Sequence, residues 1–271
     1  MGWRVRTVFV LICVCQFWCA GELAAQGSDT AAGEFVARVY TNARGETMPY
    51  RLFVPAKYDK TKKYPLVLWL HGANGRGTDN LKPISGGNAL GAGIWTRPEN
   101  QEKYPAFVLA PQAPEAALWA NRGGKEITQS LRLALEILDA VRAEFSIDAA
   151  RLYATGQSMG GGGVWDLLQR RPELFAAAVP LCGPADVNTA PQIAHIPVWV
   201  FHGEADATVP VAASRRMVEA LRAAGGQPRY TEYPGVGHMV WEKAFQEPEL
   251  VSWVFAQKRE VRKQGSTEVR K

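Results

Sequence analysis

The residues with the clearest chemical potential lie in the segment Gly156-Gln157-Ser158-Met159-Gly160. An apolar run that ends at Thr155 precedes this segment, and a helical pattern follows it. A serine on a tight turn between a strand and a helix is raised above the sheet in strained backbone, where bulky neighbours would clash. The free N–H groups at the start of the helix face developing negative charge. The pattern therefore predicts that Ser158 is a nucleophile.

A serine nucleophile needs a base and an acid that orients the base. His71, His202 and His238 stand at predicted strand ends or in loops. Only His238 comes late enough for the chain order serine, acid, histidine that such a sheet requires. It lies in the glycine-lined loop Gly235-Val-Gly-His-Met239, after the last predicted strand. We therefore predict that His238 is the base.

The acid is expected in a loop between the nucleophile and the base. Asp206 follows the apolar run 196–201 and is our first choice. Glu204, two residues closer to that run, is the main alternative, and Asp186 after the preceding run is a weaker one.

The oxyanion of an acyl-transfer reaction also needs hydrogen-bond donors. One donor is the backbone N–H after the nucleophile, here Met159, and the second comes from a loop after an early strand. The segment His71-Gly72-Ala73-Asn74-Gly75 is such a loop, and we predict that Ala73 is the second donor. We expect the His71 side chain to brace this loop without contacting substrate.

Alternating strand and helix patterns surround these residues. Apolar runs predict strands at 65–71, 106–110, 151–155, 175–181, 196–201 and 229–233. Helical patterns predict helices over 127–145, 217–224 and 249–255, and a further helix that follows the turn at Ser158 and ends at 169. Before them, residues 34–40 and 48–54 are typical of an antiparallel pair. This order predicts an α/β fold with a mainly parallel, doubly wound sheet and an antiparallel N-terminal strand pair. Ligands of such sheets bind at the carboxyl ends of the strands.

The N-terminus indicates export. Arg4 and Arg6 precede an apolar run of thirteen residues from Val8 to Ala20, which is short of the about 20 residues that span a membrane. We predict a signal peptide over residues 1–25, a single catalytic domain over 26–257, and a secreted or periplasmic location without a stable membrane anchor. An uncleaved anchor is the alternative. Cleavage leaves Cys182 as the one cysteine, so no internal disulfide is expected.

Composition and charge exclude other classes. The chain has 271 residues, of which 47% are hydrophobic, so it is neither disordered nor a low-complexity scaffold. The net charge of +5 is concentrated at the ends, mainly in a basic tail over 258–271 that we expect to be flexible. The body is neutral, so a nucleic-acid partner is not expected. The sequence has no zinc-ligand spacing, and we expect neither a metal nor an organic cofactor.

The combined motifs resemble those of the serine esterases of the α/β-hydrolase superfamily. They are His71-Gly-Ala, Gly-Arg-Gly-Thr-Asp-Asn80, Gly-Gln-Ser-Met-Gly-Gly161, His-Gly-Glu-Ala-Asp206 with Val209-Pro210, and Gly-Val-Gly-His238. The chain is similar to the secreted branch with polyhydroxybutyrate depolymerase-like enzymes, feruloyl esterases and predicted peptidases, from about Tyr50 to about Phe255. The resemblance implies an α/β-hydrolase fold with Ser158, His238 and Asp206 as nucleophile, base and acid. Serine argues against the related dienelactone hydrolases that use cysteine.

The leading hypothesis is an exported carboxylic ester hydrolase that forms an acyl-enzyme on Ser158. About fourteen residues separate the runs at 175–181 and 196, which leaves no room for a large lid, and this favours short-chain acyl or hydroxycinnamoyl esters of carbohydrates over lipids. Trp95, Trp119 and Trp241 fall in loops or near the base, and we expect them to line a substrate cleft. The alternatives are a serine peptidase with the same residues and a non-catalytic binding domain of the same fold.

Overall fold

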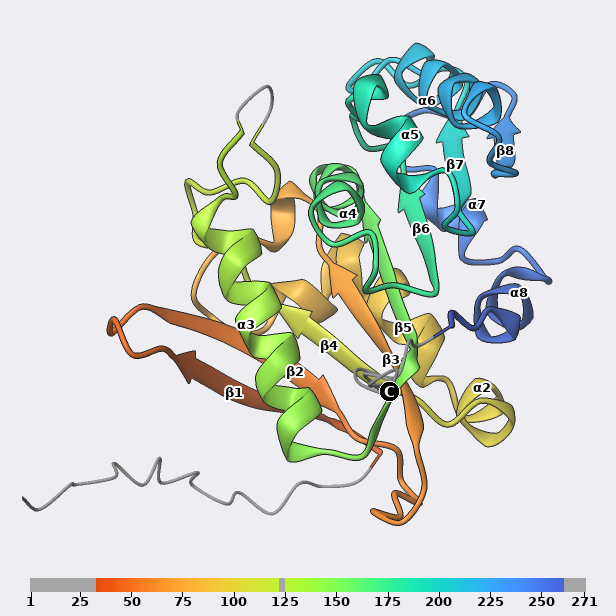
Figure 1. Ribbon diagram of the computed structural model, residues 1–271. Helices are drawn as coiled ribbons and strands as arrows, with labels where there is room; N and C mark the ends of the chain where they lie inside the picture. The colour runs from red at the N-terminus through yellow and green to blue at the C-terminus, as the bar shows by residue number, and fades with distance from the viewer. Residues whose placement is uncertain (1–32, 122–124, 261–271) are drawn as a thin grey trace, which may run out of the picture. The chain divides into compact units, whose positions relative to one another are not determined.

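The computed structural model of the chain describes residues 33–121 and 125–260 (Figure 1). The strands are β1 (Phe35–Thr41), β2 (Thr47–Phe53), β3 (Tyr64–Leu70), β4 (Phe107–Pro111), β5 (Ile147–Gln157), β6 (Ala177–Leu181), β7 (Trp199–Gly203) and β8 (Arg229–Tyr233). The α-helices are α1 (Ala89–Gly93), α2 (Pro98–Lys103), α3 (Gln129–Glu144), α4 (Met159–Arg170), α5 (Ala190–Ile193), α6 (Ala212–Ala223), α7 (Trp241–Ala244) and α8 (Leu250–Ala256). Short 3₁₀ turns are η1 (Ala73–Gly75), η2 (Lys82–Ile84), η3 (Gly86–Asn88), η4 (Ile94–Thr96) and η5 (Val187–Thr189). The predicted signal peptide and all but the first three residues of the predicted tail lie outside the described residues.

One eight-stranded sheet organises this part of the chain, in the order β1-β2-β4-β3-β5-β6-β7-β8. β2 pairs antiparallel with both β1 and β4, and the remaining neighbours pair parallel. The predicted fold class is thereby confirmed. The parallel strands all end at the same edge of the sheet, which brings the segments that follow β3, β5, β7 and β8 together.

Two apolar layers enclose the sheet. On β3, Leu66, Leu68 and Leu70 pack into a core shared with α3, α4, α5 and α6. The alternate residues Val67 and Trp69 pack into a second core with α1, α7 and α8. Figure 1 shows α3 and α4 on the face of the sheet nearer the viewer. Because central strands are covered on both faces, they appear in the sequence as continuous apolar runs rather than as alternating patterns.

Helix α3 shows how the sequence sets an element's bounds. Thr128 accepts a hydrogen bond from the N–H of Leu131 at 3.1 Å and caps the first turn. Its apolar stripe faces the core, and the helix ends before Phe145, whose backbone is extended. By contrast α1, α2, α5 and α7 have four to six residues, too few to show a helical period, and were not predicted. No helix among the described residues is long and apolar enough to cross a membrane.

The pairing of β6 with β7 is shorter than that of its neighbours. β5 and β6 share five register pairs, as do β7 and β8, whereas β6 and β7 share the pair Leu181–Phe201 and one further bridge, Ala178–Val198. The segment between β6 and β7 holds only η5 and the short helix α5.

Candidate active site

Ser158 occupies a sharp turn between β5 and α4. Its φ of 55° and ψ of −115° are strained for a residue with a side chain. A Cβ at Gly160 would lie 1.9 Å from the carbonyl oxygen of Leu70, and one at Gly156 would lie 2.6 Å from the carbonyl oxygen of Gly160. Backbone atoms cannot make room for either, so the turn requires glycine at both positions. The same crowding lifts the Ser158 side chain above the end of the sheet.

The structure brings Ser158, His238 and Asp206 together, although they lie far apart in the sequence. The Oγ atom of Ser158 lies 2.7 Å from Nε2 of His238. The other ring nitrogen of His238, Nδ1, lies 2.7 Å from Oδ2 of Asp206. His238 lies between β8 and α7, and Asp206 follows β7. This arrangement can pass the serine proton to the imidazole while the carboxylate holds the ring in orientation.

The Asp206 carboxylate is fully buried and firmly held. Its Oδ1 atom accepts hydrogen bonds from the backbone N–H groups of Thr208 at 2.8 Å and Val209 at 2.9 Å. Burial alone would raise the pKa of Asp206, but the hydrogen bonds from His238 and the two amides outweigh it, so the pKa lies below its ordinary value. Asp206 is therefore ionised at neutral pH.

The two alternative acids make other contacts. Glu204 is exposed and accepts a hydrogen bond from the N–H of Gly235 at 3.0 Å. Asp186, also exposed, accepts one from the N–H of Asn188 at 3.0 Å and caps η5. The geometry therefore favours Asp206 over both.

A second histidine, His202, lies behind the carboxylate and was not assigned a role from the sequence. It is fully buried, and its Nε2 atom lies 3.2 Å from Oδ2 of Asp206 and 2.9 Å from the carbonyl oxygen of Val209. Its Nδ1 atom lies 2.7 Å from Oγ of Ser214. A carbonyl oxygen can only accept, so Nε2 carries a proton and donates a hydrogen bond to Val209, with Oδ2 of Asp206 close beside it. A histidine at a strand end four residues before the acid was the available signal.

The loop after β3 is braced from within. Nδ1 of the fully buried His71 donates to the carbonyl oxygen of Gly72 at 2.6 Å, and Nε2 accepts from the N–H of Ala113 at 3.0 Å. Burial lowers the pKa of His71 to about 4, so the ring is neutral. The Trp119 indole N–H donates to the carbonyl oxygen of His71 at 3.0 Å. These contacts fix the backbone that leads into η1.

The two predicted oxyanion donors lie at the starts of helical turns. Met159 is the first residue of α4, and Ala73 is the first residue of η1. Within the part of the chain that the structure describes, neither amide donates a hydrogen bond, so both N–H groups are free to bind an anion.

The predicted tryptophan cleft is wrong for two of its three members. Trp95 and Trp119 have no exposed surface. Trp95 packs edge-on against Phe255 with ring centroids 6.0 Å apart, and Trp119 braces the loop after β3. Trp241 is 8% exposed and packs edge-on against His238 with centroids 5.5 Å apart, so it contacts the predicted base.

Cys182 lies beneath the predicted base. Its Sγ atom donates to the carbonyl oxygen of His238 at 3.6 Å, and burial raises the pKa of the thiol well above its usual range. Among the described residues, Cys182, Asp206 and His238 offer ligand atoms within 4.8 Å of one another. The thiol is protonated, and the carboxylate and imidazole are hydrogen-bonded to each other. In this arrangement the carboxylate and the imidazole engage each other, and the thiol engages the carbonyl oxygen of His238.

The chain is similar to a known protein family and to curated relatives. A family model described as the dienelactone hydrolase family matches residues 59–256. A probable feruloyl esterase C from Aspergillus terreus is 33% identical over 134 residues, covering 49% of this chain and 46% of that protein. One from Aspergillus niger is 27% identical over 195 residues, covering 72% of this chain and 68% of that protein. The first match thus spans about half the length of the relative.

A solved structure gives a further comparison. The crystal structure of a thermostable esterase is 40% identical, with a TM-score of 0.80, over 84% of this chain and 64% of that chain. The family match also bears on the nucleophile. Serine at position 158 does not set the chain apart from the dienelactone hydrolase family, contrary to what the sequence motif suggested.

Proposed function

Since this chain belongs to the dienelactone hydrolase family, we propose that it is a serine carboxylic ester hydrolase that works through an acyl-enzyme on Ser158. The family match and the esterase names of its relatives support a carboxylesterase-type hydrolase. The observation that carries the catalytic assignment is the hydrogen-bonded series from Ser158 Oγ through His238 to Asp206.

The geometry supports a two-step reaction. Nε2 of His238 takes the proton of Ser158 as Oγ attacks the ester carbonyl carbon. The negative charge that develops on the carbonyl oxygen is stabilised by the free N–H groups of Met159 and Ala73. When the intermediate collapses, the bond to the alcohol oxygen breaks, and His238 returns the proton to the leaving alcohol. Water, activated by the same imidazole, then releases the acid and restores Ser158. Asp206 stays ionised and stabilises the imidazolium in both steps.

We further propose that the substrates are short-chain acyl or hydroxycinnamoyl esters of carbohydrates, met outside the cell. The names of the feruloyl esterase relatives support the acyl group. The short segment between β6 and β7 supports exclusion of long acyl chains, because it offers little apolar cover. The apolar run after Arg4 and Arg6 supports export.

A substrate panel tests this proposal. We expect kcat/KM to be higher on methyl ferulate and acetylated xylan than on long-chain p-nitrophenyl esters or tripeptide anilides. Amides are harder to cleave, because the leaving nitrogen must be protonated. Higher efficiency on the anilides would support a serine peptidase instead. Binding without turnover of any of these substrates would support a binding domain.

A further inference from the structure

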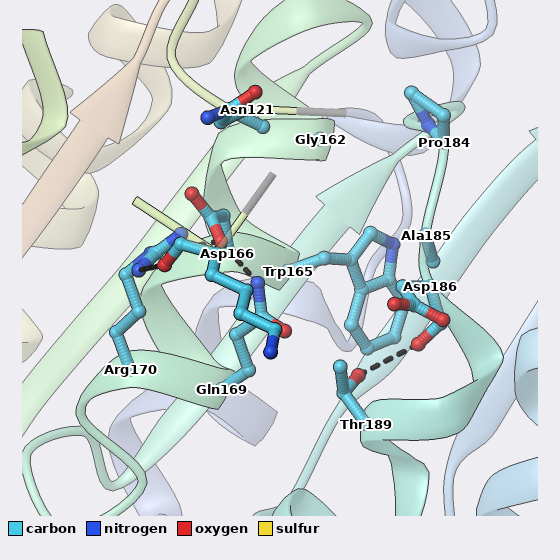
Figure 2. A pocket seen from close by; sticks show the side chains of 12 residues that line it. Asn121, Gly162, Trp165, Asp166, Gln169, Arg170, Pro184, Ala185, Asp186 and Thr189 are labelled. Atoms are coloured by element: carbon cyan, nitrogen blue, oxygen red, sulfur yellow. Dashed lines mark hydrogen bonds and ion pairs between the residues drawn. The ribbon is translucent and has the colours of Figure 1, made fainter. Parts of the chain in front are cut away.

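A pocket of about 630 Å³ lies beside α4, the helix that begins directly after Ser158 (Figure 2). Gly162, on its wall, lies one helical turn after Ser158 and donates its N–H to the Ser158 carbonyl oxygen at 3.0 Å. Pro184 and Asp186, which follow β6, form the facing wall. We propose that this pocket binds a sugar residue of the carbohydrate that carries the ester. The proposal rests on the ester hydrolase function proposed above.

Two buried polar atoms in the pocket lining point to a ligand. Trp165 and Asp166 are each 3% exposed, yet the indole Nε1 and the carboxylate Oδ2 have no hydrogen-bond partner among the described residues. The other oxygen of Asp166, Oδ1, accepts from Nε of Arg170 at 3.0 Å and from Gln169. Buried polar groups are nearly always paired in folded proteins, because an unpaired one loses its hydration without compensation. The Trp165 N–H is therefore a donor, and Asp166 Oδ2 an acceptor, that a ligand could pair.

Figure 2 shows that the Trp165 indole and the Asp166 carboxylate lie on different sides of the pocket. The Trp165 indole extends toward Ala185 and Asp186, whereas the Asp166 carboxylate lies on the side of Gln169 and Arg170. A ligand that serves both must therefore present a hydrogen-bond acceptor at one end and a donor at the other.

The charges of the lining select the class of ligand. Asp166 forms an ion pair with Arg170, and the remaining charges, Asp186 and Lys125, are opposite in sign. Among the lining residues that the structure describes, the charges therefore balance, which favours a neutral ligand. A sugar hydroxyl can both donate and accept, so one polyhydroxylated ring satisfies Trp165 and Asp166. An acyl chain would leave both unpaired.

The size and rigidity of the pocket fit this assignment. Its volume falls in the range of small-molecule sites, about 300–1,000 Å³. A Cβ at Gly183 would lie 2.2 Å from the backbone of Gly161, so the segment after β6 presses directly against α4. A Cβ at Gly162 would approach the Pro184 ring to 3.3 Å, and glycine there keeps the pocket open. The side of the pocket between α4 and the segment after β6 is therefore held rigidly.

Two conservative variants test the pocket. Trp165→Phe keeps an aromatic ring and removes the N–H, whereas Asp166→Asn keeps an oxygen for Arg170 and replaces Oδ2 by a donor. The measured quantity is kcat/KM on a feruloylated xylo-oligosaccharide divided by kcat/KM on methyl ferulate. We expect each variant to lower this ratio about fivefold, mainly through KM, which is the effect of one lost hydrogen bond. Trp253→Phe on α8, outside the pocket, is the matched control and should leave the ratio unchanged.

A binding measurement separates this proposal from the proposed function. Xylotetraose, arabinobiose and galactotetraose are titrated calorimetrically into the Ser158→Ala protein, with and without Trp165→Phe. We expect at least one sugar to bind, and Trp165→Phe to weaken its Kd about fivefold. Failure of all three to bind, or equal binding with Trp165→Phe, would overturn the sugar site. Absence of hydrolysis of methyl ferulate, acetylated xylan and the p-nitrophenyl esters would overturn the ester hydrolase function, and the titration would still decide the pocket. Should Asp166→Asn fail to fold, Trp165→Phe decides the result alone.

Discussion

Replacing Asp206 by asparagine should disable the enzyme while leaving its fold intact. Oδ1 of Asp206 accepts from two backbone N–H groups, those of Thr208 and Val209, so the amide oxygen of an asparagine must take that position. The NH₂ group must then occupy the position of Oδ2, where it faces Nδ1 of His238. Two donors cannot face each other, so His238 moves its proton to Nε2 and can no longer accept the proton of Ser158.

The expected loss in kcat is about ten-thousandfold, or about 5.5 kcal/mol of transition-state stabilisation. Hydrolysis of methyl ferulate gives kcat, and circular dichroism with thermal unfolding reports whether the fold is kept. Glu204→Gln is the matched control, because the exposed Glu204 accepts a hydrogen bond from the N–H of Gly235, which a glutamine oxygen preserves. We expect it to change kcat less than about twofold. A folded Asp206→Asn protein that retains a tenth of the native kcat, or an inactive Glu204→Gln protein, would refute the reasoning.

Three further predictions concern the nucleophile, its turn and the loop after β3. Ser158→Ala should lower kcat on the order of a millionfold and abolish labelling by a fluorophosphonate; labelling of any other residue in the native chain would contradict the assignment. Gly160→Ala should destabilise the protein by about 3 kcal/mol in urea unfolding, because its Cβ would meet the Leu70 carbonyl oxygen at 1.9 Å, and a native-like midpoint would contradict this. His71 is neutral in the fold with a pKa of about 4, so the unfolded chain, with a histidine pKa of about 6.5, binds its proton first as the pH falls. The contribution of neutral His71 to the free energy of unfolding should therefore be fully present above a pH of about 6.5 and should be lost, by about 3 kcal/mol, as the pH falls to about 4. His71→Gln should make this decline shallower.

Local chemistry was predictable from the sequence, and long-range packing was not. The turn at Ser158 was recognisable because its glycines, serine and flanking strand and helix patterns all lie within one short segment of the sequence. The position of Asp206 followed from chain order, since each strand of such a sheet delivers its loop to the same edge. By contrast Trp95 and Trp119 lie in segments that look like exposed loops. Their burial depends on α8 and on the loop after β3, which are distant in sequence.

The pocket beside α4 was missed for a related reason. Gly162, Trp165 and Asp166 recur at the spacing of one helical face, and such a stripe normally packs into a core. Only the placement of Pro184 and its neighbours against α4 shows that part of this face is open. For His202 the signal was only its place at a strand end four residues before Asp206, and the contact between the two side chains became evident from the structure.

The short pairing between β6 and β7 has a consequence for the working lifetime of the enzyme. Ser158 lies on one side of this seam, whereas Asp206 and His238 follow β7 and β8 on the other. Proteins open in cooperative parts, and weakly joined edges open before the core. Separation of the last two strands would part His238, the proposed base, from Ser158, the proposed nucleophile, while α3, α4 and the central strands remain folded. Heat should therefore inactivate the enzyme at temperatures below its main unfolding transition. Substitutions that strengthen the contacts between β6 and β7 should lengthen its active lifetime most.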